Sequence, residues 1–144
     1  EVSTMSSVRQ QPPRVLVVDD EEEVGTLLQR RLGRRGFEVG FHRGFFGVTL
    51  AAIAFRPDVL LLDINMDGLI GSSLVPALRK RAELDNCRVV LHSSIDPQEL
   101  RQRARDCGAD GCLSKSMEFA SFVAELERLV QLARVATRDA GESS

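Results

Sequence analysis

Short apolar runs alternate with longer amphipathic stretches five times along the chain. The apolar runs predict strands at 14–18, 37–41, 58–63, 88–93 and 110–114. Runs such as VLVV and VLLL are apolar at consecutive positions, which is typical of strands buried on both faces of a parallel sheet. The stretches between and after them repeat apolar residues at helical spacing, and they predict helices at 20–36, 45–55 and 72–82, from 96 onward, and at 117–134. This order predicts an α/β fold: a doubly wound, flavodoxin-like sheet of five parallel strands with five helices, in a single domain.

Several residues mark where the predicted helices begin and end. Asp96, Pro97 and Glu99 form an N-terminal signature, because an aspartate caps the helix and proline suits its first position. Asp20 is predicted to cap the first helix, and Gly36 to end it. Pro76 falls in the first turns of the helix predicted at 72–82, where proline does little damage.

Outside the alternating pattern, both ends of the chain are polar. Residues 1–13 end in two prolines and predict a flexible N-terminal segment, and residues 135–144 predict a flexible C-terminal tail. Residues 14–134 form the predicted domain. The ten residues after 134 are too few to fold an output domain, so we expect either a stand-alone regulator that acts through protein contacts or a domain cut from a longer chain.

Composition narrows the class of protein. The net charge of −2 over 144 residues gives no electrostatic footprint for nucleic acid, and the arginine clusters stand at helical spacing beside acidic residues. There is no long apolar segment, so no membrane partner is expected. The three cysteines form no metal-binding or C-x-x-C pattern and predict reduced thiols in a cytoplasmic protein.

Three carboxylates stand where two predicted strands end. Asp19 and Asp20 follow VLVV, and Asp63 follows VLLL. The carboxyl ends of neighbouring parallel strands meet at one edge of a sheet, where open α/β sheets bind ligands. Like charges gathered there either raise their pKa values or take up a cation, and oxygen ligands on a hydrated rim suit Mg²⁺. The sequence therefore predicts a magnesium site for phosphate chemistry.

Two further side chains follow later strands and complete this set. Ser93 ends the strand at 88–93, and Lys115 follows the strand at 110–114. Three acids, a hydroxyl and an ammonium group can hold Mg²⁺, let a carboxylate attack a phosphoryl group, and neutralise the group transferred. The expectation requires the carboxyl of Asp63 to lie near those of Asp19 and Asp20 and within reach of solvent.

The ordered segments VLVVDDEEE, PDVLLLDINM, VVLHSS and GADGCLSKS resemble the receiver domain of two-component response regulators, over residues 14–133. The resemblance implies that Asp63 accepts a phosphoryl group from a histidine kinase or histidine phosphotransfer protein. It also implies that Asp19, Asp20, Asp63 and the backbone carbonyl of Asn65 bind Mg²⁺, with Ser93 as the switch hydroxyl and Lys115 paired with the phosphoryl oxygens. Such a domain is not an enzyme beyond its own phosphorylation and slow dephosphorylation.

The resemblance also implies where signals leave the domain. In this family a downstream protein usually binds the face formed by the fourth helix, the fifth strand and the fifth helix. The same face could support a homodimer. Neither expectation involves direct contact with nucleic acid.

Three positions depart from the family pattern. Asp67 stands where proline is usual in the loop after the phosphoacceptor, and Ser116 replaces the proline after the lysine, which makes the customary cis peptide costly. Cys112 stands where an aromatic switch residue is common. These departures keep an alternative open: a constitutive interaction domain, or pseudo-receiver, that is not switched by phosphorylation.

Enzymes on the same architecture fit less well. A haloacid-dehalogenase-type phosphatase needs an aspartate two residues after its nucleophile, where this chain has Asn65. A flavodoxin needs a phosphate-binding loop after the first strand, where this chain has the acidic run DDEEE. His42 and His92 lack a catalytic or metal-binding constellation, and we expect structural or surface roles for both.

Overall fold

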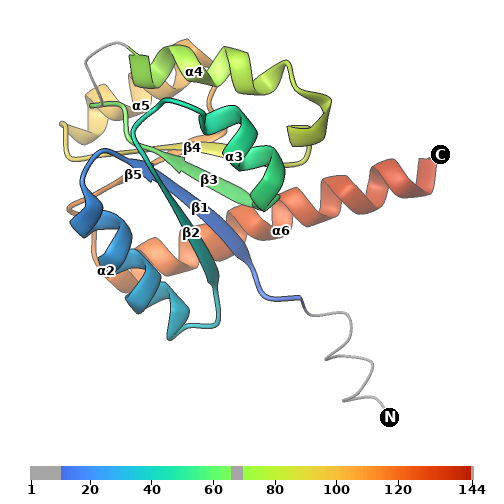
Figure 1. Cartoon of the computed structure of the whole chain (residues 1–144), viewed down its shortest axis with the longest axis horizontal. Coiled ribbons are helices and arrows are strands. Elements are labelled where there is room, and N and C mark those ends of the chain that lie inside the picture. The colour runs from blue at the N-terminus through green and yellow to red at the C-terminus, as the bar shows by residue number, and fades with distance from the viewer. Residues whose placement is uncertain (1–10, 66–69, 144) are drawn as a thin grey trace.

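The computed structural model describes residues 11–65 and 70–143 (Figure 1). In chain order the elements are β1 (Arg14–Asp19), α2 (Glu22–Gly33), β2 (Glu38–Arg43), α3 (Val48–Phe55), β3 (Val59–Leu62), α4 (Ile70–Arg79), the short 3-10 helix η1 (Ala82–Leu84), β4 (Arg88–Ser93), α5 (Pro97–Cys107), β5 (Gly111–Ser114) and α6 (Phe119–Ser143). The predicted strands agree with these bounds to within two residues.

All five strands are parallel and lie in the order β2-β1-β3-β4-β5. Two layers of helices cover the sheet: α3, α4 and α5 pack on one face, and α2 and α6 pack on the other (Figure 1). Because each crossover places a helix over the sheet, the central strands are buried on both sides. The predicted fold class is confirmed.

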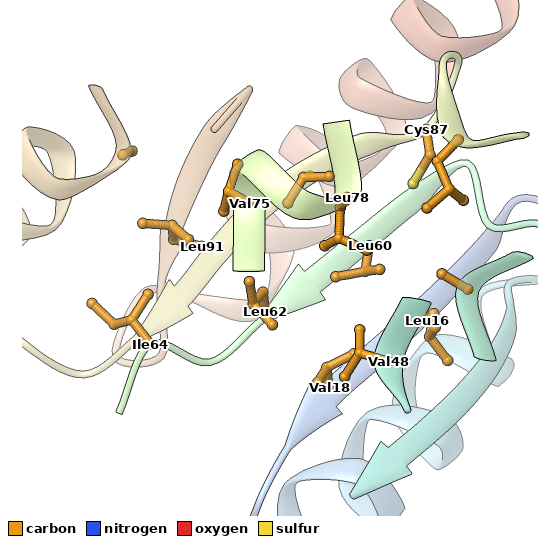
Figure 2. Close-up of a cluster of buried hydrophobic side chains, with 14 of the residues drawn as sticks. Leu16, Val18, Val48, Leu60, Leu62, Ile64, Val75, Leu78, Cys87 and Leu91 are labelled. Carbon is orange, nitrogen blue, oxygen red and sulfur yellow. The ribbon is translucent and has the colours of Figure 1, made fainter. Parts of the chain in front are cut away.

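Alternate residues of each central strand feed two separate cores. Leu16, Leu60 and Leu62 point to the face of α3, α4 and α5, where Figure 2 shows Val48 of α3 beside Val18. Val15, Val17, Val59 and Leu61 point to the face of α2 and α6. This period-two alternation explains why the strand sequences are apolar at every position.

Gly25 allows α2 to pack closely on β2. A Cβ atom at Gly25 would lie 2.3 Å from the ring of Phe41, whereas a Cβ at Gly33 in the same helix would meet nothing within 4 Å. We expect Gly25→Ala to destabilise the fold by roughly 1–3 kcal/mol through overpacking. Gly33→Ala should be neutral or stabilising by up to about 1 kcal/mol, because alanine favours the helix. Urea unfolding of both variants measures the difference, and equal stabilities would contradict the packing argument.

The predicted cap of the first helix is wrong, and the predicted cap of α5 is confirmed. Glu21, not Asp20, is the N-cap residue of α2, and its side chain makes no capping bond. The backbone N–H of Glu21 instead donates to Oδ1 of Asp19 at 2.9 Å. At α5, Asp96 accepts from the N–H groups of Gln98 and Glu99, as predicted. Asp20 is exposed, and its carboxylate forms no hydrogen bond or ion pair with residues 11–65 or 70–143.

Two helix positions also differ from the prediction. α4 begins at Ile70, two residues earlier than predicted, so Pro76 is its seventh residue and lies at the end of its second turn. α6 does not end at Arg134 but continues to Ser143 and projects beyond the sheet in Figure 1. The segment 135–140, VATRDA, mixes apolar and polar residues without a proline, and the helix continues through Gly141, so the predicted end was too early.

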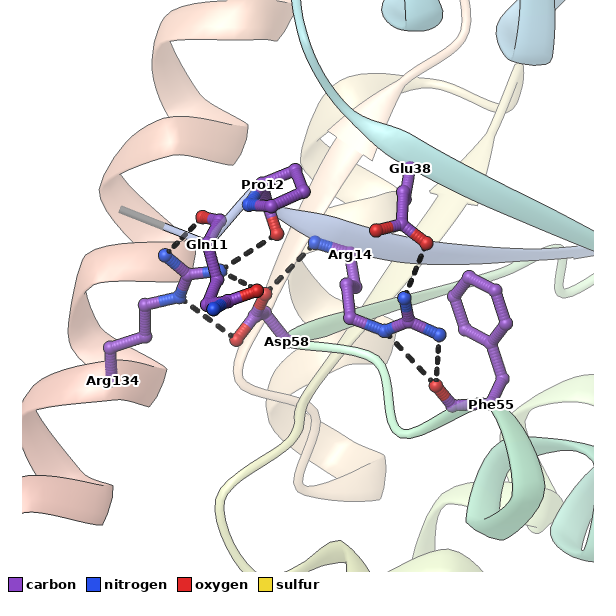
Figure 3. A network of polar contacts seen from close by, with 7 residues as sticks. All are labelled: Gln11, Pro12, Arg14, Glu38, Phe55, Asp58 and Arg134. Carbon is purple, nitrogen blue, oxygen red and sulfur yellow. Dashed lines mark hydrogen bonds and ion pairs between the residues drawn. The ribbon is translucent and has the colours of Figure 1, made fainter. Parts of the chain in front are cut away.

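Arg134 ties α6 to the start of β1 (Figure 3). Its guanidinium donates to the carbonyls of Gln11 and Pro12 at 2.8 and 2.9 Å and pairs with Asp58 at 3.1 Å. Asp58 also accepts the backbone N–H of Arg14 at 2.9 Å. The residues just before β1, predicted to be flexible, are thus bonded to the fold at 11 and 12.

Within the part of the chain that the structure describes, no helix combines the length and apolar character needed to cross a membrane.

Candidate functional site

The carboxyl ends of four strands meet at one edge of the sheet. The register aligns Val18 of β1 with Leu62 of β3, and Ser93 of β4 with Ser114 of β5. Asp19, Asp63, Ser93 and Lys115 each end one of these strands or follow it directly. We call these four residues together with Asp20 the strand-end site.

Lys115 lies between two of the carboxylates. Its Nζ atom is 2.8 Å from Oδ2 of Asp19 and 3.7 Å from Oδ2 of Asp63. Burial alone lowers the pKa of Lys115, but the two carboxylates outweigh it and raise that pKa above its ordinary value. The ammonium group therefore stays charged and joins β5 to β1 and β3.

Asp63 is close to Asp19 but is almost covered. It is 2 % exposed, so the expectation that its carboxyl is reachable from solvent is not met. Oδ1 accepts the backbone N–H of Asn65 at 3.0 Å, while Oδ2 forms an ion pair with Lys115 at 3.7 Å and no hydrogen bond with a described residue. Burial, together with the charges of Asp19 and Asp20, raises the pKa of Asp63 despite the opposing effects of Asn65 and Lys115. Oδ2 is the freer oxygen for chemistry.

Ser93 is fully buried and faces the segment after Asp63. Its Oγ accepts the backbone N–H of Ile95 at 3.2 Å and the side-chain amide of Asn65 at 3.3 Å. Asn65 was predicted to act through its backbone carbonyl. The structure shows that its N–H and its side chain also link Asp63 to Ser93.

The acidic residues form a cluster that differs from the predicted one. Among the residues that the structure describes, oxygens of Asp19, Asp20 and Glu21 come within 4.8 Å of one another, and Asp63 is not in that group. Glu21 was not among the predicted metal ligands, although its place directly after two aspartates was a signal. Oδ2 of Asp19 is buried, and the Lys115 ammonium at 2.8 Å is the partner that the described residues supply to it. Such an oxygen beside exposed carboxylates fits a hard divalent cation.

The three departures from the family pattern have different outcomes. Asp67 lies outside the described residues. No described peptide bond is cis, so the bond before Ser116 is trans, and Ser116 hydrogen-bonds Ser114 through its N–H and its hydroxyl. Cys112 is half-buried against the core, and burial raises the pKa of its thiol.

The two histidines have structural surroundings, in agreement with expectation. Nε2 of His42 lies 2.5 Å from the carbonyl of Phe46. His92 is buried on β4 with its ring 5.4 Å from that of Phe122 on α6. Burial, with a smaller effect of Lys115, lowers the pKa of His92 to about 4, so this side chain is neutral at pH 7.

The sequence of the chain is similar to those of two curated regulatory proteins of mycobacteria. The chain is 39% identical over 123 residues to the transcriptional regulatory protein PrrA of Mycobacterium tuberculosis, covering 83% of this chain and 50% of PrrA. It is 33% identical to the response regulator MprA of Mycobacterium bovis, covering 90% of this chain and 55% of MprA. The chain therefore spans about half the length of these curated relatives.

Solved structures agree on the fold. The chemotaxis protein CheY4 of Vibrio cholerae superposes with a TM-score of 0.73 at 24% identity, covering 83% of this chain and 99% of CheY4. A putative response regulator from Chloroflexus aurantiacus gives a TM-score of 0.75 at 21% identity, covering 84% of this chain and 99% of that one. The family described as the response regulator receiver domain matches residues 15–127. The chain belongs to the response regulator receiver domain family.

Proposed function

We propose that the chain is a phosphorylation-switched signalling receiver in which Asp63 accepts a phosphoryl group from a histidine kinase or histidine phosphotransfer protein. The observation that carries the proposal is the ammonium of Lys115, 2.8 Å from Asp19 and 3.7 Å from Asp63. A lysine in this place can neutralise phosphoryl oxygens once they are attached to Asp63.

The transfer uses the freer oxygen of Asp63. Oδ2 attacks the phosphorus of a phosphohistidine, an O–P bond forms as the N–P bond breaks, and the imidazole nitrogen leaves with the bonding electron pair. Asn65 holds Oδ1 in place through its N–H, at 3.0 Å. The hydroxyl of Ser93, already bonded to Asn65 at 3.3 Å, is placed to donate to the product.

The metal site of this proposal rests on the acidic cluster. Asp19 and Asp20, with Asp63 and the backbone carbonyl of Asn65, would hold Mg²⁺, and Glu21 is near enough to assist through its carboxylate. When bound, Mg²⁺ supplies positive charge that offsets the charge of the phosphoryl oxygens.

The burial of Asp63 favours a second candidate, a constitutive interaction domain. Its carboxylate is 2 % exposed and has Lys115 beside its free oxygen, so a donor reaches it only if neighbouring groups shift. In this candidate the strand-end site only stabilises the fold, and partner binding does not respond to a change at Asp63.

Signals would leave through a protein partner on the face of α5, β5 and the start of α6. A hollow of about 480 Å³ lies there, lined in part by Leu100, Cys112, Met117 and Ser121. The three cysteines form no disulfide, which suits a cytoplasmic protein. We propose no enzymatic activity beyond the domain's own phosphorylation and dephosphorylation.

The proposal predicts that the chain, incubated with Mg²⁺ and a small phosphodonor such as acetyl phosphate, gains ~80 Da, the mass of one phosphoryl group, as seen by intact-mass spectrometry. Asp63→Asn should gain nothing, because the amide keeps the shape but lacks the nucleophile. Asp58→Asn, at the opposite end of β3, is the matched control and should be modified like the wild type. An unmodified wild type, or a modified Asp63→Asn variant, contradicts the proposal.

A further inference from the structure

The outer face of α3 is an apolar stripe exposed to solvent. Leu50 and Ala54 stand four residues apart in α3 and so share one face of the helix, and Phe46 lies in the turn just before it. Phe46 is 87 % exposed and Leu50 is 70 % exposed. No charged residue occurs in the twelve positions from 44 to 55. We call Phe46, Leu50 and Ala54 the α3 stripe.

The residues of the α3 stripe do not contribute to the packing of α3 on the sheet. The opposite side of α3 carries Val48 and Ala52, which are buried against β1, as Figure 2 shows for Val48 and Val18. A helix with one buried face ordinarily carries polar or charged residues on the other. Large apolar side chains held in water on a folded surface mark a site for a partner.

The turn before α3 holds Phe46 outward. Gly44 and Gly47 both have left-handed backbone conformations, with φ of 75° and 77°, which other residues rarely adopt. Between them Phe45 packs against the core, while Nε2 of His42 lies 2.5 Å from the carbonyl of Phe46. The two glycines and the contact with His42 therefore define the backbone conformation that places Phe46 on the surface.

Both ends of the α3 stripe are basic. Arg43 precedes the stripe and is exposed. Its Nε donates a hydrogen bond to the backbone carbonyl of Asp20 at 3.3 Å. Arg56 follows it, is exposed, and makes no ion pair with any residue of the described ranges 11–65 and 70–143. Two copies packed antiparallel through this face would place Arg43 of one beside Arg56 of the other, which is unfavourable. The charges therefore favour a different partner.

We propose that the α3 stripe binds an amphipathic helix of another protein whose apolar face is flanked by acidic residues at both ends. Acidic groups there would pair with Arg43 and Arg56. At the end of α3, a hollow of about 480 Å³ is lined by Arg56 and also by Asp58 and Glu83. These two carboxylates pair with Arg134 and Arg81, which leaves the charge of Arg56 for a partner. This surface differs from the face of α5 and β5, so its partner differs from the one proposed there.

Two stapled helical peptides test the proposal by fluorescence anisotropy at low salt. Both carry leucines at one face over about 15 residues, long enough for a helix; one has glutamates at both ends and the other has lysines. The acidic-ended peptide should bind at least about tenfold more tightly, a difference of about 1.4 kcal/mol. Phe46→Ser and Leu50→Ser should each weaken its binding at least about tenfold, whereas Leu132→Ser, a 43 % exposed leucine on α6, should not.

Several results would overturn the proposal. If both peptides bind equally, the surface binds apolar peptides without regard to charge. If the acidic-ended peptide does not bind, the proposed partner is wrong. A dimer of the wild-type chain that Phe46→Ser abolishes in ultracentrifugation would make a second copy the occupant. If Phe46→Ser fails to fold, Arg56→Asn serves instead, because asparagine accepts the left-handed backbone found at Arg56 (φ 57°) and only the charge is lost. That variant must reduce the preference for the acidic-ended peptide.

Discussion

We expect the wild-type protein to lose about 3 kcal/mol of folding stability through His92 as the pH falls from 6.5 to about 4. The variant His92→Leu should not show this loss. In the fold, burial lowers the pKa of His92 from 6.5 to about 4. In the unfolded chain the imidazole keeps its ordinary pKa. Between these two values the unfolded state binds a proton that the folded state does not, so acid favours unfolding.

The sign and the pH window follow from that difference. Above pH 6.5 the imidazole is neutral in both states, and below about 4 it is charged in both, so the loss accumulates only in between. Asp63 acts in the opposite direction, because its raised pKa makes the folded state bind a proton first on acidification. Subtracting the Leu variant from the wild type isolates the contribution of His92. Leucine also packs beside Phe122 without a polar nitrogen to bury.

Urea unfolding at a series of pH values measures the effect. Parallel stability curves for the wild type and His92→Leu across this window would show that His92 does not titrate as its burial implies.

The fold and the meeting of the strand-end residues were predictable because they depend on local pattern and topology. Consecutive apolar positions indicate strands covered on both faces, and parallel strands bring their carboxyl ends to one edge. Asp19, Asp63, Ser93 and Lys115 could therefore be placed together without coordinates. The cap at Asp96 was equally local, since its signature lies within four residues.

Other features could not be predicted from the sequence, because they depend on which side chains compete for one partner and on contacts between residues far apart in the chain. Asp19 takes the N–H of Glu21, so Asp20 is not the cap that its position suggests. Lys115 pairs with Asp19 more closely than with Asp63, and Asp63 is covered, because the packing of separate elements decides both. The bonds of Arg134 to residues 11 and 12 cross more than 120 positions, which no local pattern records.

Replacing Lys115 by methionine is expected to destabilise the fold by about 3–5 kcal/mol, since it leaves the buried carboxylate of Asp19 without its cation. Asp19 is 0 % exposed and cannot recover this interaction from water. Lys80 is the only other lysine and is exposed, so Lys80→Met should change stability by no more than about 0.5 kcal/mol.

The same variant tests whether the acidic cluster accepts a divalent cation. With Lys115 removed, Oδ2 of Asp19 loses the partner that lies 2.8 Å away in the wild type, and Mg²⁺ can supply positive charge in its place. Added Mg²⁺ should therefore raise the unfolding temperature of Lys115→Met more than that of the wild type, because a ligand that binds only the folded state stabilises it. The further change Asp20→Asn should abolish this gain. An equal response to Mg²⁺ in Lys115→Met with and without Asp20→Asn would place the cation elsewhere, and the phosphoryl chemistry proposed for Asp63 would then lack its metal.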